Sequence, residues 1–297
     1  LNNLNNIAAT DIDGDSTIDV LAITNSDLYV YKNLGDTAFS SKQLITGDPL
    51  FGRNVFPIDI EGDGDIDLLT SDFSRDDIAL FRNQGGGIFG TKQTIESNLN
   101  GASSTFAAHL DGDNHLDIVA FSQTESALQS YTNLGNGFFT GEKIIGRTAD
   151  GVRFVRLGDI DGDSDIDMVA TTFKDNTIEW YENVTGSFVA EHNVISNAWS
   201  VHGLRLADLD RDHDLDIIYS SSLYGHITWL PNDGSGNFGA PQTVDNTLGF
   251  PYEIQVADLD HDNDLDIVSG AGDSTDVAWF ENDGDGNFTT RHEISNS

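Results

Sequence analysis

The hydrophobic and polar positions of this chain alternate over short distances, a pattern that predicts strands separated by turns. Runs with apolar residues at most positions recur along it: VLAI, LLTS, IVAF, MVAT, IIYS and IVSG. A short run that is apolar on both faces is typical of a strand buried between two other sheets. A half-apolar run such as YEIQVA comes before it, and after it come an aromatic run such as TIEWYEN, a glycine-rich turn and a fourth run such as FTTRHEI. Helical periodicity is nowhere sustained, so we expect an all-β protein.

Two sequence markers repeat with the same period along the chain. The first is a nine-residue acidic segment that starts six times, at Asp11, Asp59, His109, Asp159, Asp208 and Asp258. The second is an Asn followed five or six residues later by a Phe, at Asn33, Asn83, Asn133, Asn183, Asn232 and Asn282. Two markers in fixed phase indicate a repeat architecture. The predicted repeats are approximately 1–48, 49–98, 99–148, 149–197, 198–247 and 248–297.

Four antiparallel strands in about 50 residues form the blade of a β-propeller. Because the repeats use up the chain, the sequence predicts one domain, 1–297, folded as a six-bladed β-propeller. A stacked solenoid is the alternative, but four-stranded meanders curve readily into a ring that leaves few exposed edges. Seven blades would fit if the parent protein contains one more repeat.

The charge of the chain narrows its possible partners. The sequence has 50 Asp and Glu residues against 14 Lys and Arg, for a formal net charge of −36. Such a surface repels nucleic acid and anionic membranes, and no apolar run approaches the ~18 residues of a membrane span. We therefore expect neither nucleic-acid binding nor membrane insertion. Cysteine is absent, and the chain starts at Leu1 rather than Met, which indicates a processed portion of a longer polypeptide or assembly.

The acidic segments have the pattern of a calcium-binding loop. Calcium binds roughly six to eight oxygens, and short Asp side chains at alternate positions of a tight loop can supply them. In the first repeat we assign side-chain oxygens to Asp11, Asp13, Asp15 and Asp19, and a backbone carbonyl to Thr17. The eighth position is always Ile or Leu, which would pin the loop to the core and aim the ninth-position Asp at the ion. An EF-hand does not fit, because it needs a Glu at the twelfth position and flanking helices.

The other five loops offer equivalent candidate ligands. Magnesium fits less well than calcium, because it keeps its waters and prefers small octahedral sites. The alternative, that the acidic residues merely solubilise turns, gives no reason for one spacing to recur six times. The candidates are Asp59, Glu61, Asp63, Asp65 and Asp67; Asp111, Asp113, His115 and Asp117; Asp159, Asp161, Asp163, Asp165 and Asp167; Asp208, Asp210, Asp212, Asp214 and Asp216; and Asp258, Asp260, Asp262, Asp264 and Asp266.

The motif D-x-D-x-D-G-x-x-D resembles the FG-GAP/VCBS repeats, the calcium-binding propeller blades of integrin α-chain heads, some fungal lectins and many secreted bacterial proteins. The resemblance covers the whole chain and implies the same ligand positions, with up to six calcium ions. The chain departs from the motif at His109 and at Glu61, where Asp is expected. The loops that start at Asp159, Asp208 and Asp258 follow it best, and we expect the His109 loop to bind most weakly or to stay empty.

The sixth loop position is the other departure from the family motif. The family has glycine there, and this chain keeps it only as Gly64. Asn114 and Asn263 can adopt positive φ, as His213 can less readily, whereas Ser16 and Ser164 are poorer substitutes.

The expected calcium affinity also indicates a location. Extracellular calcium modules bind with dissociation constants on the order of 10⁻⁴ to 10⁻³ M. Such loops would be filled outside a cell and largely empty in cytosol. We therefore expect an extracellular protein, secreted or at the cell surface.

Ligand binding is expected on the face opposite the calcium loops. In an up-and-down blade the calcium loops and the Asn turns share one face, and the opposite face carries loops that vary between repeats, where binding usually resides. Aromatic residues there could stack on a sugar ring, or they could cap the spaces between blades. The candidates are Phe51, Phe73, Phe173, Trp199, Tyr224, His226 and Phe250. Trp180, Trp229 and Trp279 share a slot three residues before the turn Asn and are expected in the core between blades.

Three functions are compatible with these features. The first is a non-catalytic binding or adhesion module for a glycan or an extracellular protein. The second is a secreted polysaccharide-degrading enzyme, a lyase or glycosidase, for which Tyr224 and His226, with His202 and Arg205 nearby, form a conceivable catalytic group. The third is a structural spacer in a large surface protein or filament. The sequence favours the first, because calcium binding accounts for nearly all the paired carboxylates that a glycosidase would need.

Overall fold

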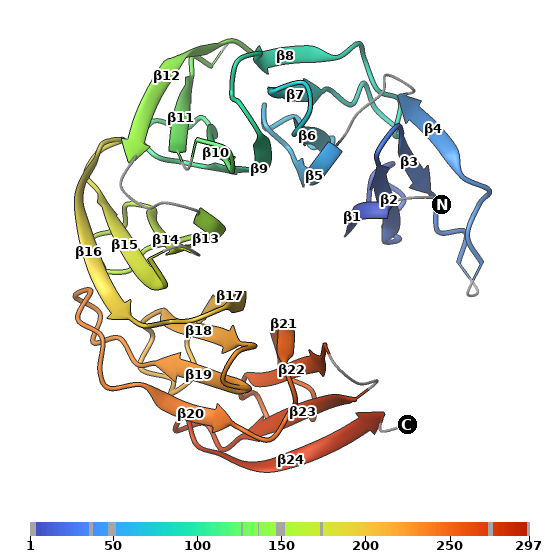
Figure 1. The fold of residues 1–297 in the computed structure, drawn as a ribbon. Helices are drawn as coiled ribbons and strands as arrows, with labels where there is room; N and C mark the ends of the chain where they lie inside the picture. The colour runs from blue at the N-terminus through green and yellow to red at the C-terminus, as the bar shows by residue number, and fades with distance from the viewer. Residues whose placement is uncertain are drawn as a thin grey trace. The chain divides into compact units, whose positions relative to one another are not determined.

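The computed structural model describes residues 4–35, 38–46, 52–125, 127–135, 137–146, 152–172, 175–272 and 276–295. All regular structure in these ranges is β, and 24 strands form six antiparallel four-stranded sheets (Figure 1). Every sheet pairs its strands in chain order, first with second, second with third and third with fourth. These are the sheets of a six-bladed β-propeller, which confirms the predicted fold class. Within the described ranges, no helix is long and apolar enough to cross a membrane.

Contacts along the chain divide the blades into two compact units. The first unit comprises Leu1–His109 and Asp113–Thr148, and the second comprises Leu110–Gly112 and Ala149–Ser297. That they act as one domain over 1–297 stays a prediction. The first unit holds blade 1, with β1 (Leu4–Thr10), β2 (Asp19–Thr24), β3 (Leu28–Tyr31) and β4 (Gln43–Thr46); blade 2, with β5 (Gly52–Ile58), β6 (Asp67–Asp72), β7 (Asp77–Phe81) and β8 (Gln93–Glu96); and blade 3, with β9 (Ala102–Ala108), β10 (Asp117–Ser122), β11 (Ala127–Asn133) and β12 (Phe139–Gly146).

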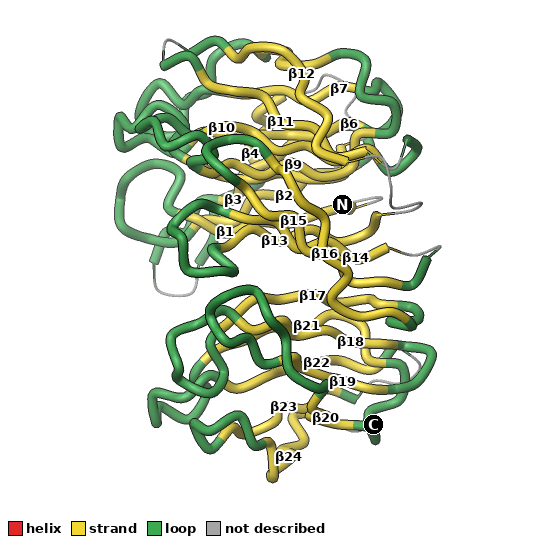
Figure 2. The backbone as a smooth tube through the Cα atoms, turned by 90° about the vertical axis from the view of Figure 1, so that its left-hand side faces the viewer, coloured by secondary structure: helices red, strands yellow, loops and turns green. Residues whose placement is uncertain are grey.

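The second unit has the same construction. Figure 2 shows that loops gather at the two ends of its strands, so that each blade presents two separate loop-bearing ends. It holds blade 4, with β13 (Val152–Gly158), β14 (Asp167–Thr172), β15 (Thr177–Asn183) and β16 (Phe188–Ser196); blade 5, with β17 (Val201–Ala207), β18 (Asp216–Ser221), β19 (His226–Leu230) and β20 (Gln242–Asp245); and blade 6, with β21 (Pro251–Ala257), β22 (Asp266–Ala271), β23 (Val277–Asn282) and β24 (Phe288–Ser295).

The apolar core lies between neighbouring blades. Every residue of the second strands β6, β10, β14 and β18 is buried, as the doubly apolar runs predict. Leu68 of β6 belongs to one buried cluster with Leu21 of β2, and Ile217 of β18 belongs to another with Val169 of β14. Blades 2 and 5 therefore bury apolar surface on both faces, against the blades before and after them in the same unit, and such burial is the main source of stability in this arrangement.

Two of the three predicted core tryptophans lie buried against the turn of the next blade. Trp180 and Trp229 are buried, and a Cβ atom added to Gly236 or Gly286 would lie 2.4 Å from the respective indole ring. Glycine in the Asn turn therefore leaves the space that the ring fills. Trp279, in the last blade of the chain, is half-buried and stacks on His292 with ring centroids 4.1 Å apart. The core prediction is confirmed for the first two and only partly correct for Trp279.

Candidate metal centres and ligand surface

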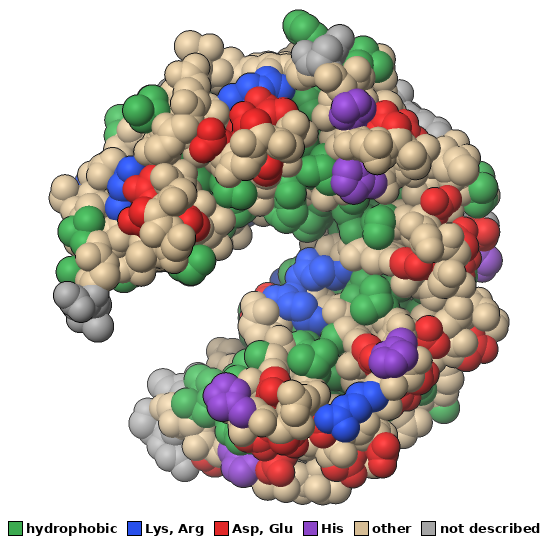
Figure 3. Space-filling view, turned by 180° about the vertical axis from the view of Figure 1, so that it is seen from behind, with side chains coloured by type: hydrophobic (Ala, Val, Ile, Leu, Met, Phe, Trp, Pro, Cys, Tyr) green, Lys and Arg blue, Asp and Glu red, His purple; other side chains and the backbone are tan. Residues whose placement is uncertain are grey.

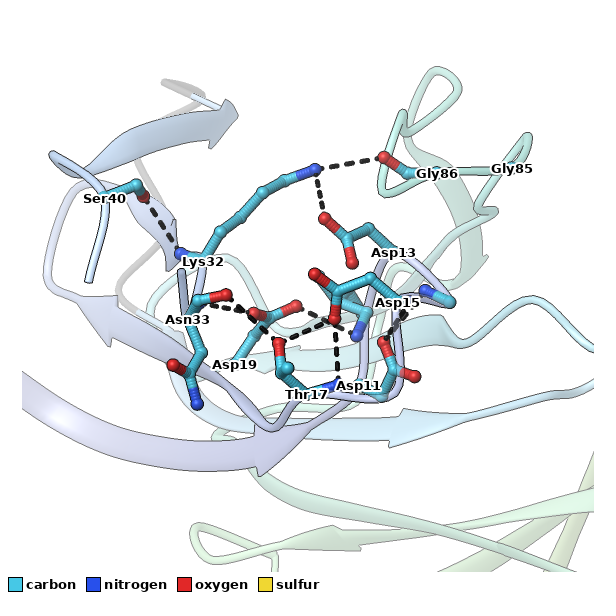
Figure 4. A network of polar contacts seen from close by, with 12 residues as sticks. Asp11, Asp13, Asp15, Thr17, Asp19, Lys32, Asn33, Ser40, Gly85 and Gly86 are labelled. Atoms are coloured by element: carbon cyan, nitrogen blue, oxygen red, sulfur yellow. Dashed lines mark hydrogen bonds and ion pairs between the residues drawn. The ribbon is translucent and has the colours of Figure 1, made fainter. Parts of the chain in front are cut away.

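Each acidic loop joins the first strand of a blade to its second and is closed by its own backbone. In the first loop, Asp11 Oδ1 accepts a hydrogen bond from the Gly14 N–H at 2.8 Å, and its Oδ2 accepts one from the Ser16 N–H at 2.7 Å. Asp15 Oδ1 accepts from the N–H of Thr17 at 2.8 Å and from its hydroxyl at 2.6 Å. Figure 4 shows this network. These bonds are made within the loop and restrain its shape.

The ninth-position Asp binds backbone N–H groups from two separate segments. Asp19 is fully buried, its Oδ2 accepts from the Ile12 N–H at 3.1 Å, and its Oδ1 accepts from the Asn33 N–H at 2.7 Å. This carboxylate therefore fastens the acidic loop to the Asn turn, a role that the sequence analysis missed. The same pair of bonds recurs at Asp67, Asp167, Asp216 and Asp266.

The turn Asn connects its own blade to the blade before it. Asn83 Nδ2 donates to the Ile66 carbonyl at 3.1 Å in its own loop and to the Ile12 carbonyl at 2.9 Å in the preceding loop. The strict recurrence of this Asn was a signal in the sequence, but spacing alone does not identify its acceptors. Corresponding bonds of 2.7 to 2.9 Å join Asn183 to Leu110, Asn232 to Ile160 and Asn282 to Leu209.

Four loops bring three carboxylates close enough to share one cation. In each of these groups, one oxygen from every carboxylate lies within 4.8 Å of the others. Two buried oxygens, Asp13 Oδ1 and Asp208 Oδ1, have no hydrogen-bond partner in the described part of the chain. Anionic, oxygen-only donor sets suit a hard divalent cation, so these residues fit calcium. The groups are Asp11, Asp13 and Asp15; Asp159, Asp161 and Asp167; Asp208, Asp210 and Asp216; and Asp258, Asp260 and Asp262.

Burial and mutual repulsion disfavour the charged forms of these carboxylates when no cation is present. Burial, followed by the neighbouring carboxylate of Asp212, raises the pKa of Asp210. Burial also raises the pKa of Asp167 to about 6 and the pKa of Asp216 to about 7. A cation in the loop would favour the charged forms instead, so metal binding and loss of protons are coupled.

The first and second loops each hold a positively charged side chain of the protein itself. Lys32 Nζ lies 2.8 Å from Asp13 Oδ2 (Figure 4), and Arg82 Nε lies 2.9 Å from Glu61 Oε1. Both cations stand at the position directly before the turn Asn. The fourth and sixth repeats have Glu at this position. The third-position acids of these two loops, Asp13 and Glu61, are therefore each paired with a positively charged side chain. That side chain would compete with a metal ion for the carboxylate.

The second and third loops contribute nothing to the four carboxylate groups found among the described residues. In the second loop, the third-position acid Glu61 is directed to Arg82. In the third loop, the His109 ring replaces the first-position carboxylate, and its Nδ1 lies 3.1 Å from the His115 carbonyl oxygen, a predicted metal ligand. That the His109 loop binds most weakly stays a prediction, and this contact supplies a physical reason for it.

The loop position that packs into the core differs between repeats. Ile12 is buried, whereas the eighth-position Ile18 is exposed. The prediction that the eighth position anchors the loop is therefore wrong for the first repeat. In the fifth and sixth repeats, the eighth-position residues Leu215 and Leu265 pack against apolar clusters shared with the preceding blade.

Three of the predicted aromatic residues are exposed at the end of the second unit opposite its acidic loops. Trp199 precedes β17, Tyr224 lies between β18 and β19, and Phe250 precedes β21; their exposed fractions are 40%, 53% and 49%. This exposure leaves part of each ring available to a ligand, and that these residues bind a ligand rather than cap the spaces between blades stays a prediction. Phe73 and His226 are half-buried, and Phe73 faces the Arg53 guanidinium at 4.8 Å. Phe51 and Phe173 lie outside the described residues.

A cavity of about 300 Å³ lies beside the acidic loop of blade 2, on the side that was expected to be purely structural. It was missed because its walls come from two repeats. The lining residues are Glu61, Arg82, Gln93, Gly135, Gly137 and the exposed Phe138.

The comparisons with known proteins agree with the repeat pattern. Four overlapping segments, residues 11–70, 59–120, 109–170 and 159–219, match the model of the FG-GAP-like repeat, and together they span more than half of the chain. The chain belongs to the FG-GAP-like repeat family. Comparison with curated protein sequences finds no match.

Solved structures of other propellers share the fold of this FG-GAP-like protein. A lectin of Agrocybe aegerita that recognises non-reducing terminal N-acetylglucosamine is 21% identical over 100% of this chain and 81% of its own, with a TM-score of 0.78. A chain of the nidogen–laminin complex is 11% identical over 91% of both chains, with a TM-score of 0.55. At these identities the likeness concerns the fold alone.

The sixth position of these FG-GAP-like loops adopts left-handed backbone geometry even where glycine is absent. Ser16 has φ = 72°, Ser164 has φ = 75° and His213 has φ = 78°. Residues with a Cβ atom are strained in this region by roughly 1 kcal/mol or more. The expectation that serine is a poor substitute at this position therefore has a structural basis.

We expect Ser164→Gly to stabilise the protein by about 1 kcal/mol, because glycine adopts positive φ without the Cβ clash. Urea denaturation in saturating calcium would measure the change in the free energy of unfolding. Ser74→Gly is the matched control, since Ser74 is an exposed loop serine outside the left-handed set and should lose stability on the same change. Equal effects of the two substitutions would contradict the strain argument.

The conceivable catalytic group is divided in the FG-GAP-like structure. The rings of Tyr224 and His226 lie 5.9 Å apart. His202, in contrast, contacts Arg153 and Tyr252, and Arg205 forms an ion pair with Glu253 at 2.6 Å. The residues thus take part in three separate sets of contacts, which gives the enzyme hypothesis no geometric support.

Proposed function

We propose that this chain is a calcium-stabilised, non-catalytic carbohydrate-binding module that acts outside the cell. The observation that carries the proposal is the set of three exposed aromatic side chains at one end of blades 5 and 6, Trp199, Tyr224 and Phe250. The fold of a lectin over the full length of the chain supports the glycan assignment. The four carboxylate groups support the calcium assignment.

The exposure of these aromatics favours a ligand with flat apolar faces. Large aromatic side chains bury roughly 150 to 250 Å² each when they are covered, so leaving three in water forgoes stabilisation that the fold could have used. The C–H face of a pyranose ring covers such a ring while its hydroxyls reach polar loop groups. Because the three residues belong to connections between strands, they can vary without disturbing the sheets.

A glycan array, run in calcium with wild type and Trp199→Ala, tests this proposal. We expect wild type to bind at least one glycan class and Trp199→Ala to lose about tenfold in affinity, the loss that follows from about 1.4 kcal/mol of stacking. Phe138→Ala, which removes an exposed aromatic on the calcium side, is the matched control and should bind as wild type does.

The alternative functions make different predictions in the same experiment. If the effects of the two variants are reversed, the sugar binds in the cavity beside Glu61 and Arg82. If incubation with acidic polysaccharides gives unsaturated product absorbance, the chain is a lyase. If wild type binds no glycan, the carbohydrate proposal is wrong, and an extracellular protein partner or a spacer role takes its place.

A further inference from the structure

The first strands of blades 4, 5 and 6 form a continuous row of hydrogen-bonding and aromatic side chains. At the second position of β13, β17 and β21 stand Arg153, His202 and Tyr252. Arg153 Nη2 lies 2.9 Å from His202 Nδ1, and the His202 and Tyr252 ring centroids are 4.2 Å apart. Each strand carries a register shift at this position, the kind of irregularity that redirects a side chain. The three strands therefore present these groups side by side.

A second set of cations follows on the same strands. Arg156 of β13 and Arg205 of β17 occupy equivalent fifth positions, and β21 has Gln255 there. Arg205 Nε donates to Gln255 Oε1 at 3.3 Å, while its Nη2 binds Glu253, the only acidic residue on the three strands. Figure 3 shows Lys and Arg side chains gathered along the inner edge of this unit.

These arginines are unusual in so acidic a chain. Three of its 14 Lys and Arg residues lie on β13 and β17, which contain no Asp or Glu at all. Both Arg153 and Arg156 are half-buried, and neither forms an ion pair with a carboxylate in the described ranges. Burial, and then the nearby Arg205, lowers the pKa of Arg156 to about 10, so its guanidinium stays charged at neutral pH. The carboxylate of Glu253 also acts on Arg156, but it is already paired with Arg205, so these half-buried charges are incompletely balanced, which is costly.

We infer that this row, from Arg153 to Tyr252 with Arg156 and Arg205, is the subsite for the carboxylate of an acidic saccharide such as a uronate. The guanidinium fork matches a carboxylate in shape and charge, and the His202 and Tyr252 rings offer an apolar face to the sugar. Trp199 lies just before β17 and Phe250 just before β21, so both aromatic residues are at the strand ends that carry His202 and Tyr252. The inference rests on the proposed function, and it specifies the class of glycan.

Calorimetric titration of the calcium-loaded protein with tri-galacturonate, and with the same trimer after reduction of its carboxyl groups, tests the subsite. We expect the acidic trimer to bind at least about tenfold more tightly than the reduced one, the size of one charge-assisted pair. Arg156→Gln should remove about tenfold from the affinity for the acidic trimer and leave the reduced trimer unaffected. Arg156→Lys, which keeps the charge without the fork, should fall between the two.

Arg53→Gln is the matched control, because Arg53 occupies the second position of β5 in the first unit and its substitution removes the same charge. It should bind both trimers as wild type does.

Equal affinity of wild type for the two trimers, or equal losses in Arg156→Gln and Arg53→Gln, would overturn the subsite while leaving carbohydrate binding intact. Failure of both trimers and of the neutral glycans would reject the proposed function itself. Binding of poly-glutamate as tightly as the acidic trimer would overturn the saccharide assignment. Melting of each variant in calcium verifies folding, and a fall in wild-type affinity for the acidic trimer with salt gives a readout independent of any variant.

Discussion

Removal of divalent cations with EDTA is expected to lower the free energy of unfolding of this protein by about 10 kcal/mol. Each of the four carboxylate groups would lose the stabilisation from its ion, about 2.7 kcal/mol when calcium stands at 100 times its dissociation constant. For units of this size such a loss lowers the melting midpoint by tens of degrees. Scanning calorimetry in calcium and in EDTA measures the change. An unchanged midpoint, together with elemental analysis that finds no calcium in the native protein, would refute the metal assignment.

The pH dependence of the free energy of unfolding, measured once in EDTA and once in calcium, provides a control for that experiment. In EDTA the raised pKa values of Asp167, about 6, and Asp216, about 7, mean that the folded state binds protons more tightly than the unfolded chain. Their contribution to stability is therefore full below the ordinary Asp pKa of about 4 and is lost as pH rises toward 7. With calcium present the ion binds the deprotonated forms, and stability should rise over the same interval. Parallel curves would mean that no ion binds among these carboxylates.

Asp216→Asn is expected to destabilise the second unit by about 4 to 6 kcal/mol in saturating calcium. Asp216 is fully buried, and its two oxygens accept from the N–H groups of Leu209 and Asn232, each at 2.9 Å. An asparagine has one oxygen, so its amide group would face a buried N–H donor and leave it unsatisfied, which costs about 1 to 3 kcal/mol. Loss of the ion from the same loop adds about 2.7 kcal/mol in saturating calcium. Urea denaturation with and without calcium separates the two contributions.

Asp214→Asn, two residues earlier in the same loop, is the matched control. Its predicted contribution to the metal site is a backbone carbonyl, which the substitution keeps, and burial together with Asp212 and Asp208 raises the pKa of its carboxyl. Removal of this charge relieves repulsion, so little change in the melting midpoint is expected. If both variants melted alike, the ninth-position carboxylate would have no special structural role.

Most of the architecture was predictable because each blade repeats the same local pattern. The doubly apolar runs identified the buried second strands, and the 48- to 50-residue phase of the acidic segments identified six four-stranded blades. The paired spacing of Asp208 and Asp210 likewise predicted carboxylates that the structure brings together. In each case the information lies within one repeat, where sequence distance and spatial distance correspond.

The features that were missed involve partners from other segments. Nothing near Asp19 in the sequence shows that it binds the N–H of Asn33, and nothing near Glu61 shows that it pairs with Arg82. Ile18 was misassigned for the same reason, since the eighth position is partly buried through contacts with other segments, as at Leu215 and Leu265, and Ile18 is exposed. Pairings of this kind are selected by tertiary packing, which periodicity does not encode.

The amide of each turn Asn has a consequence for how such a protein can be lengthened or shortened. Asn83, Asn183, Asn232 and Asn282 each need a carbonyl that belongs to the previous blade. A cut between two sheets would separate that donor from its acceptor, whereas a module running from one acidic loop through the turn Asn of the following blade, as from Ile12 to Asn83, carries donor and acceptor together. Duplication or grafting in this architecture should therefore respect a boundary offset from the visible sheet.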